Sequence, residues 1–132
     1  MTFPITLLYA GGLGALMAVL SIRVPLKRGV LDMPMGDGGD EDLATRIRVF
    51  GNFTEYVPMA LVLMLLLESA GASPAALHAM GGTLLAARLV HARYLRMRPR
   101  LDLRQKMGRA VGAMLTWLVV TSAAGYALAL AL

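Results

Sequence analysis

Four long apolar stretches dominate this chain and limit the folds open to it. They run over residues 3–24, 45–70, 74–94 and 107–132, and the part of the second from 57 to 67 has no charged residue. About 20 helical residues cross the ~30 Å hydrocarbon core of a bilayer, so each stretch is long enough to span it. The first stretch lacks a preceding basic segment and a clear cleavage site, so we expect it to remain as a helix. The sequence predicts an all-α integral membrane four-helix bundle.

The positive charges are confined to two regions. All 13 lysines and arginines lie within residues 23–48 and 88–109, whereas the turn at 68–74 and both chain ends have none. Cytoplasmic connections of membrane proteins carry an excess of lysine and arginine. We therefore expect both basic connections in the cytoplasm and both termini on the opposite side of the membrane.

Composition excludes several classes of function. A chain of 132 residues with no cysteine is expected to be one domain, 1–132, without disulfides or thiolate chemistry. Its two histidines, His78 and His91, form no metal-ligand pattern, so we expect no metal site. The net charge of +5 comes from the ends of apolar stretches. That distribution argues against nucleic acid and favours anionic headgroups or a small anionic ligand.

Short sequence signals indicate where the second helix starts and which residues lie where helices contact one another. The acidic run 40–42 follows a glycine-rich turn, and its spacing fits the start of a helix better than a calcium-binding loop. Small residues at Gly11, Gly12, Gly14 and 123–125 are typical of close helix contacts in lipid. Four short helices leave little room for an internal cavity, which favours a homo-oligomer with ligand sites between protomers.

A polar cluster lies at the start of the second apolar helix. Arg48, Asn52 and Glu55 have i, i+4, i+7 spacing and share one helix face, with Tyr56 beside them. Charged groups facing a membrane bundle need polar partners, so we expect them to bind a zwitterionic ligand and Glu55 to pair with Arg88. The alternative is structural, with Arg48 at the headgroups and the other two residues bonding between helices. Tyr56 is either a hydrogen-bond donor to the ligand or a packing residue.

The third helix ends with three further candidates at one-turn spacing, Arg88, His91 and Tyr94. We expect Arg88 to face inward, because it precedes the cluster of arginines that follows this helix. His91 and Tyr94 fit a binding site and an interfacial belt equally well.

Basic residues also precede the fourth helix. Arg109 and Arg104 are the candidates for stabilising a developing thiolate or holding a carboxylate at the mouth of a site. Lys106, in contrast, is explained by the positive-inside rule alone.

Several of these segments resemble a known family. The run 46–58 contains an Arg-x3-Asn-x2-Glu-Tyr-x-Pro element that is similar to the second-helix signature of the MAPEG family, the membrane-associated proteins in eicosanoid and glutathione metabolism. Segments 36–39, 87–92 and 109–116 resemble bacterial members in the same order. The resemblance covers nearly the whole chain.

The resemblance implies a homotrimer in a bacterial inner membrane, with periplasmic termini and glutathione as co-substrate between subunits near the cytoplasmic side. The implied glutathione contacts are Arg48, Asn52, Glu55, Tyr56, Arg88 and Tyr94, and His91 belongs to the candidate set. An arginine near the start of the fourth helix, Arg104 or Arg109, is implied to activate the thiol. Gly51 departs from the basic residue that some eukaryotic members carry.

The resemblance also implies a function. A glutathione-dependent transferase or peroxidase acting on lipophilic electrophiles or lipid peroxides is the first expectation, with membrane lipid and a small lipophilic substrate as partners. The alternative is a non-catalytic trimer that binds lipid or a partner protein, since the family contains such members. A small transporter is a weaker third option, because no inverted repeat is visible.

Overall fold

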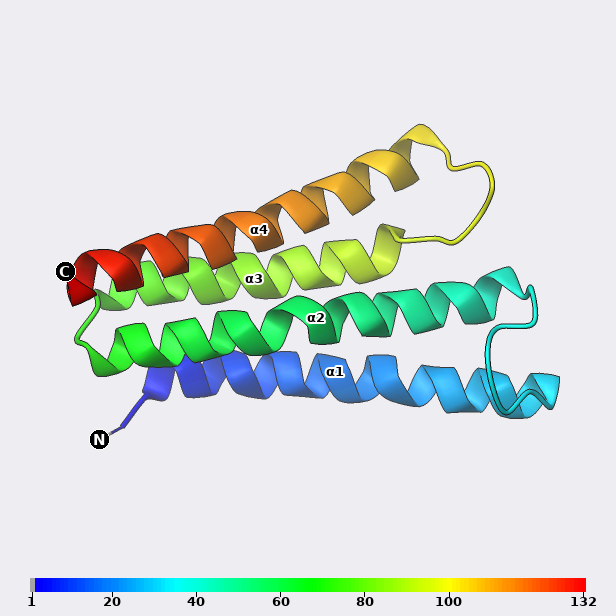
Figure 1. Ribbon diagram of the computed structural model, residues 1–132, viewed down its shortest axis with the longest axis horizontal. Helices are drawn as coiled ribbons and strands as arrows, with labels where there is room; N and C mark the ends of the chain where they lie inside the picture. Colours follow the sequence, from blue (N-terminus) through cyan, green and yellow to red (C-terminus); the bar gives the residue numbers. More distant parts are fainter. Residues whose placement is uncertain (1) are drawn as a thin grey trace.

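The computed structural model describes residues 2–132, which form four helices and their connections. The helices are α1 (Pro4–Leu31), α2 (Glu41–Ser69), α3 (Pro74–Tyr94) and α4 (Leu103–Ala131). Successive helices run in opposite directions, so both termini and the α2–α3 turn lie at one end and the two longer connections lie at the other (Figure 1). The expected all-α fold is confirmed, and the two basic regions meet at one end, which we call the basic end.

Three helices are longer than the apolar pattern predicted, and one of them, α2, begins at Glu41 instead of near residue 45. α1 continues to Leu31 instead of ending near residue 24, and α4 begins at Leu103 instead of near 107. The extension of α1 is basic, and its Lys27 ammonium lies 3.5 Å from the carboxylates of both Asp40 and Asp42. The end of the apolar run of α1 is therefore not the end of the helix, because the polar side chains that follow it have partners.

Capping side chains set where α2 and α4 begin. The Asp40 carboxylate accepts the backbone N–H of Leu43 at 2.7 Å, which confirms the expected helix start after the glycine-rich turn. At α4, Asp102 accepts the N–H of Gln105 at 2.7 Å, and the Gln105 side chain accepts the N–H of Asp102 at 3.3 Å. Both caps lie at the basic end and fix the position of the residues that follow them.

Helices α2 and α3 form the centre of the bundle. Each contacts all three other helices, whereas α1 and α4 do not touch each other within the described chain. The main core lies along all four helices and extends to the residue after α3. Its buried members are Leu13, Leu20, Val49, Phe53, Val57, Ala60, Leu84, Leu95 and Val119.

Three of the four helices, α1, α2 and α4, are long and apolar enough to cross a membrane. Little of their apolar surface is covered within the protomer, and Leu7 is 73% exposed and Leu26 is 62% exposed. Of the four spans that the sequence predicts, these three meet this description. α3 is shorter, at 21 residues, and less apolar, and its buried residues include Arg88 and His91, whose polar groups face the other helices.

A cationic groove as the candidate functional site

A buried arginine joins three helices near the basic end. Arg88 on α3 is only 1% exposed, and its Nη2 donates to Oδ1 of Asn52 on α2 at 2.9 Å. Its Nη1 lies 3.4 Å from Oγ1 of Thr116 on α4, and its guanidinium lies 5.6 Å from the ring centroid of Phe53. The expectation that Arg88 faces inward is confirmed. A buried guanidinium with these partners fixes the orientation of Asn52.

One turn further along α3, His91 is also buried, and its Nδ1 lies 3.4 Å from Nη2 of Arg88. α4 passes very close to this point at Gly112. A Cβ atom on Gly112 would lie 2.7 Å from Cβ of His91 and 2.9 Å from the carbonyl oxygen of Ala87. Only glycine permits this approach without displacing α4, so His91 and the start of α4 are held side by side.

A groove of about 460 Å³ opens next to Asn52 and His91. Its volume lies in the range of small-molecule sites. Three cations, Arg48, Lys106 and Arg109, border it, and none of its lining residues is acidic. The remaining wall is mainly apolar, formed by Leu95, Met97, Ala110, Ala113, Met114 and Trp117. We call this feature the cationic groove.

The pairing of the α2 cluster differs from the expectation. Glu55 pairs with Arg48 rather than with Arg88, at 3.2 Å between Oε1 and Nη1, and both side chains are about half exposed, at 46% and 52%. The i, i+7 spacing places the two groups along the same outward face, while Asn52 is turned toward α3 and takes the hydrogen bond of Arg88. In the protomer, Arg48 and Glu55 therefore face outward and not into the bundle.

The other predicted residues divide between the groove and its surroundings. Arg109 lines the groove, whereas Arg104 is exposed on the first turn of α4 and is not part of the lining. Tyr94 packs on Gly108 and has the Arg93 guanidinium 5.7 Å from its ring centroid, also outside the lining. Tyr56 is half-buried one turn beyond Asn52.

Sequence reasoning missed several groove residues, chiefly Lys106, Met114 and Trp117. They share one face of α4 with Arg109, because Arg109, Met114 and Trp117 follow Lys106 by three, eight and eleven residues. That spacing was visible in the sequence, but nothing in it indicated that this face of α4 borders Asn52.

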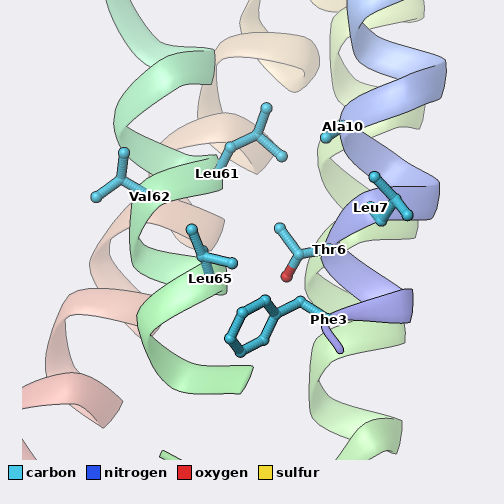
Figure 2. A pocket seen from close by; sticks show the side chains of 7 residues that line it. All are labelled: Phe3, Thr6, Leu7, Ala10, Leu61, Val62 and Leu65. Carbon is cyan, nitrogen blue, oxygen red and sulfur yellow. The ribbon is translucent and has the colours of Figure 1, made fainter. Parts of the chain in front are cut away.

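A second cleft of about 360 Å³ lies between α1 and α2 near the opposite end (Figure 2). Phe3, Thr6, Leu7, Ala10, Leu61, Val62 and Leu65 line it. It contains no titratable side chain, so it offers no acid, base or charged binding group. The cationic groove is the better candidate for chemistry.

Comparison with known proteins agrees with this architecture. The family model described as the MAPEG family matches residues 6–129. The chain is similar to inner membrane protein YecN of Escherichia coli K12, with 40% identity over 87 residues, and to the same protein of strain CFT073 at the same identity. The match covers 66% of this chain and 66% of YecN, just under two thirds of its length. No solved structure matches. The extent of the family match and the apolar helices show that this chain is a membrane protein of the MAPEG family.

Proposed function

We propose that this chain is a glutathione-dependent membrane enzyme of the transferase or peroxidase type, and that glutathione binds in the cationic groove. The observation that carries the proposal is the charge of the groove, which Arg48, Lys106 and Arg109 border with no acidic residue in the lining. Of these three cations only Arg48 has an ion-pair partner among the described residues, Glu55, which lies outside the lining. Glutathione has two carboxylates and a thiol that reacts as a thiolate. Guanidinium and ammonium groups are suitable partners for all three anionic groups.

The proposed roles follow from position. Arg48 and Lys106 bind carboxylates, Asn52 is held in place by Arg88, and Glu55 takes the ammonium group. Arg109 lies on the α4 side, next to Ala113, where the apolar wall begins. A cation there lowers the pKa of a bound thiol and favours the thiolate.

Along α4 the wall of the groove changes from basic, at Lys106 and Arg109, to apolar, at Met114 and Trp117. A lipophilic acceptor would enter from the bilayer on the Trp117 side and meet the sulfur beside Arg109. In conjugation, the thiolate sulfur bonds to the electrophilic carbon as the leaving group departs with the bonding electrons. This arrangement suits a substrate that dissolves in membrane lipid.

We further propose a homotrimer in the bacterial inner membrane, in which a neighbouring subunit completes the groove. The half-exposed pair Arg48 and Glu55, on the outward face of α2 beside the groove, supports an interface at this face. The proposed orientation has the basic end in the cytoplasm and both termini in the periplasm. The two basic connections at one end of the bundle support it (Figure 1).

Thermal denaturation of the purified protein in detergent, with and without glutathione, tests the binding step. A ligand of the folded state raises the apparent Tm, so we expect a rise in the wild-type protein and a smaller one in Arg109→Gln. Arg100→Gln, which removes an exposed charge from the connection before α4, is the matched control and should behave as wild type. Arg104→Gln should fall near the control, which would decide between the two arginine candidates.

Turnover of 1-chloro-2,4-dinitrobenzene or a lipid hydroperoxide with glutathione tests the chemistry. We expect activity in the wild-type protein and in Arg100→Gln, and a strong loss in Arg109→Gln. A thermal shift without turnover of any of several acceptors would indicate binding without catalysis. The absence of both signals would contradict the proposal and leave the lipid-binding or partner-binding alternative.

A further inference from the structure

Three arginines line a further, smaller pocket at the basic end, distinct from both the cationic groove and the cleft between α1 and α2. The pocket lies between α1, α2 and α3 and has Arg23, Arg46 and Arg96 in its wall. The rest of its lining is Leu20, Thr45, Val49 and Ala92, of which Leu20, Thr45 and Val49 are buried. None of these residues lines the cationic groove. We call this feature the arginine pocket.

The positive charge of the arginine pocket is only partly balanced. Arg46 is paired with Asp42 at 2.9 Å. Among the ion pairs of the described residues, none includes Arg23 or Arg96, and Arg96 Nη1 donates only to the carbonyl of Leu95, at 2.7 Å. Like charges this close repel one another unless an anion lies between them.

The surroundings of Arg96 increase this imbalance. Arg96 lies in the connection after α3, where burial lowers the pKa of its guanidinium. The neighbouring cations Arg93, Arg98 and Arg23 lower that pKa further, and the carboxylate of Asp42 offsets only part of the decrease. An anion bound in the pocket would offset both effects.

Backbone contacts hold the arginines together despite the repulsion. The hydroxyl of Thr45 on α2 accepts the backbone N–H of Met97 at 2.9 Å, which fixes the connection carrying Arg96 against α2. Arg46 Nη1 donates to the carbonyl oxygen of Arg23 at 3.1 Å, which joins α2 to α1. The arrangement is therefore set by the fold and is available to a ligand in advance.

Size and position select the ligand. The free space is about 20 Å³, room for about one water-sized group, compared with about 460 Å³ in the cationic groove. It therefore admits a phosphate oxygen between the arginines, with the rest of the headgroup outside, and it does not admit a peptide. Guanidinium groups match the geometry of phosphate oxygens, and basic pockets between membrane helices on the cytoplasmic side bind anionic headgroups. We propose that the arginine pocket binds the phosphate group of an anionic phospholipid through Arg23, Arg46 and Arg96. This proposal does not depend on glutathione binding.

Thermal denaturation in neutral detergent, with added phosphatidylglycerol or phosphatidylcholine, tests the proposal. We expect phosphatidylglycerol to raise the Tm of the wild-type protein more than phosphatidylcholine does, and the double variant R23Q/R96Q to lose at least half of that difference. The matched control is R93Q/R100Q, which removes the same charge from exposed positions at the same end and should keep the wild-type response. An equal loss in both double variants would mean general attraction to basic residues and would overturn the proposal.

Two further arms complete the test. If inorganic phosphate alone reproduces the shift, and R23Q/R96Q abolishes it, the phosphate site stands but the phospholipid source is overturned. If R23Q/R96Q does not fold, native mass spectrometry of the wild-type protein decides the question. Phosphatidylglycerol should then stay bound at collision energies that remove phosphatidylcholine, and equal retention of the two lipids would overturn the proposal.

Discussion

Gly112 lies where α4 comes closest to α3, and its replacement by alanine tests whether this contact sets the geometry of the groove. The new Cβ would lie 2.7 Å from Cβ and 2.8 Å from the backbone nitrogen of His91, and 2.9 Å from the carbonyl oxygen of Ala87. Backbone atoms within a helix cannot rotate away, so the two helices must separate. Overpacking of this kind costs about 1–3 kcal/mol.

The same substitution also changes helix propensity, and a second glycine of α4 separates the two effects. Gly125 has no atom near its Cβ position within the described chain, so Gly125→Ala should gain about 1 kcal/mol from propensity alone. The difference in unfolding free energy between the two variants therefore measures the helix contact, and we expect about 1–3 kcal/mol.

Reversible unfolding in mixed micelles, followed by far-ultraviolet circular dichroism, gives these free energies. Gly112→Ala should be less stable than wild type, and Gly125→Ala should be at least as stable. Because Gly112 lies against His91, which lines the groove together with Arg109, Gly112→Ala should also reduce the thermal shift with glutathione. Equal stability of the two variants would refute the reasoning, since it would mean that α4 does not rest on α3 at this point.

Three further predictions concern polar contacts, each read from the same unfolding assay. Glu68→Ala should cost about 1–3 kcal/mol, because its carboxylate accepts two backbone N–H groups at the start of α1, at 2.8 and 2.9 Å; an unchanged stability would contradict this. Asn52→Ala should destabilise the protein more than Arg88→Met. The alanine variant leaves the buried Arg88 guanidinium without its shortest hydrogen bond, whereas methionine at position 88 removes the buried charge itself. The reverse order of stabilities would show that Asn52 and Arg88 are not strongly coupled. Thr45→Val should cost about 1 kcal/mol by removing the acceptor for the N–H of Met97, and it should reduce the response to phosphatidylglycerol.

Much of the fold could be predicted from the sequence because apolar length, charge placement and helix caps are local signals. The four helices and the start of α2 at Asp40 follow from such signals. The contacts of the glycines, in contrast, do not follow from local signals. Gly11 and Gly14 face no neighbour within the protomer, whereas Gly81, Gly108 and Gly112 lie against Tyr9, Tyr94 and His91. Whether a glycine is in contact depends on how each helix is rotated about its axis, and only tertiary packing fixes that rotation.

The candidate site could be predicted in part for the same reason. The spacing of Arg48 and Glu55 places them along one helix face, but the structure turns that face outward and Asn52 toward α3. The inward position of Arg88 follows from its place before the basic cluster. The pairing of these residues involves two helices, and the sequence could not show that Arg88 bonds to Asn52 and leaves Glu55 to Arg48. The face of α4 that completes the groove was not predicted, because no local sequence pattern indicates which helices are neighbours in the fold.

Membrane topology alone explains some of the arginines of this chain, but it does not explain others. The positive-inside rule requires only that basic residues lie on the cytoplasmic side, and exposed groups such as Arg100 and Arg104 satisfy it. It does not require a buried arginine, because burial of an ion is costly, and it does not require cations to face one groove without an acid. Arg88 at 1% exposure and Arg109 in the groove wall therefore need another explanation. The anion that we propose for the groove would offset the field of Arg109, while Arg88 holds the Asn52 amide that this anion would meet.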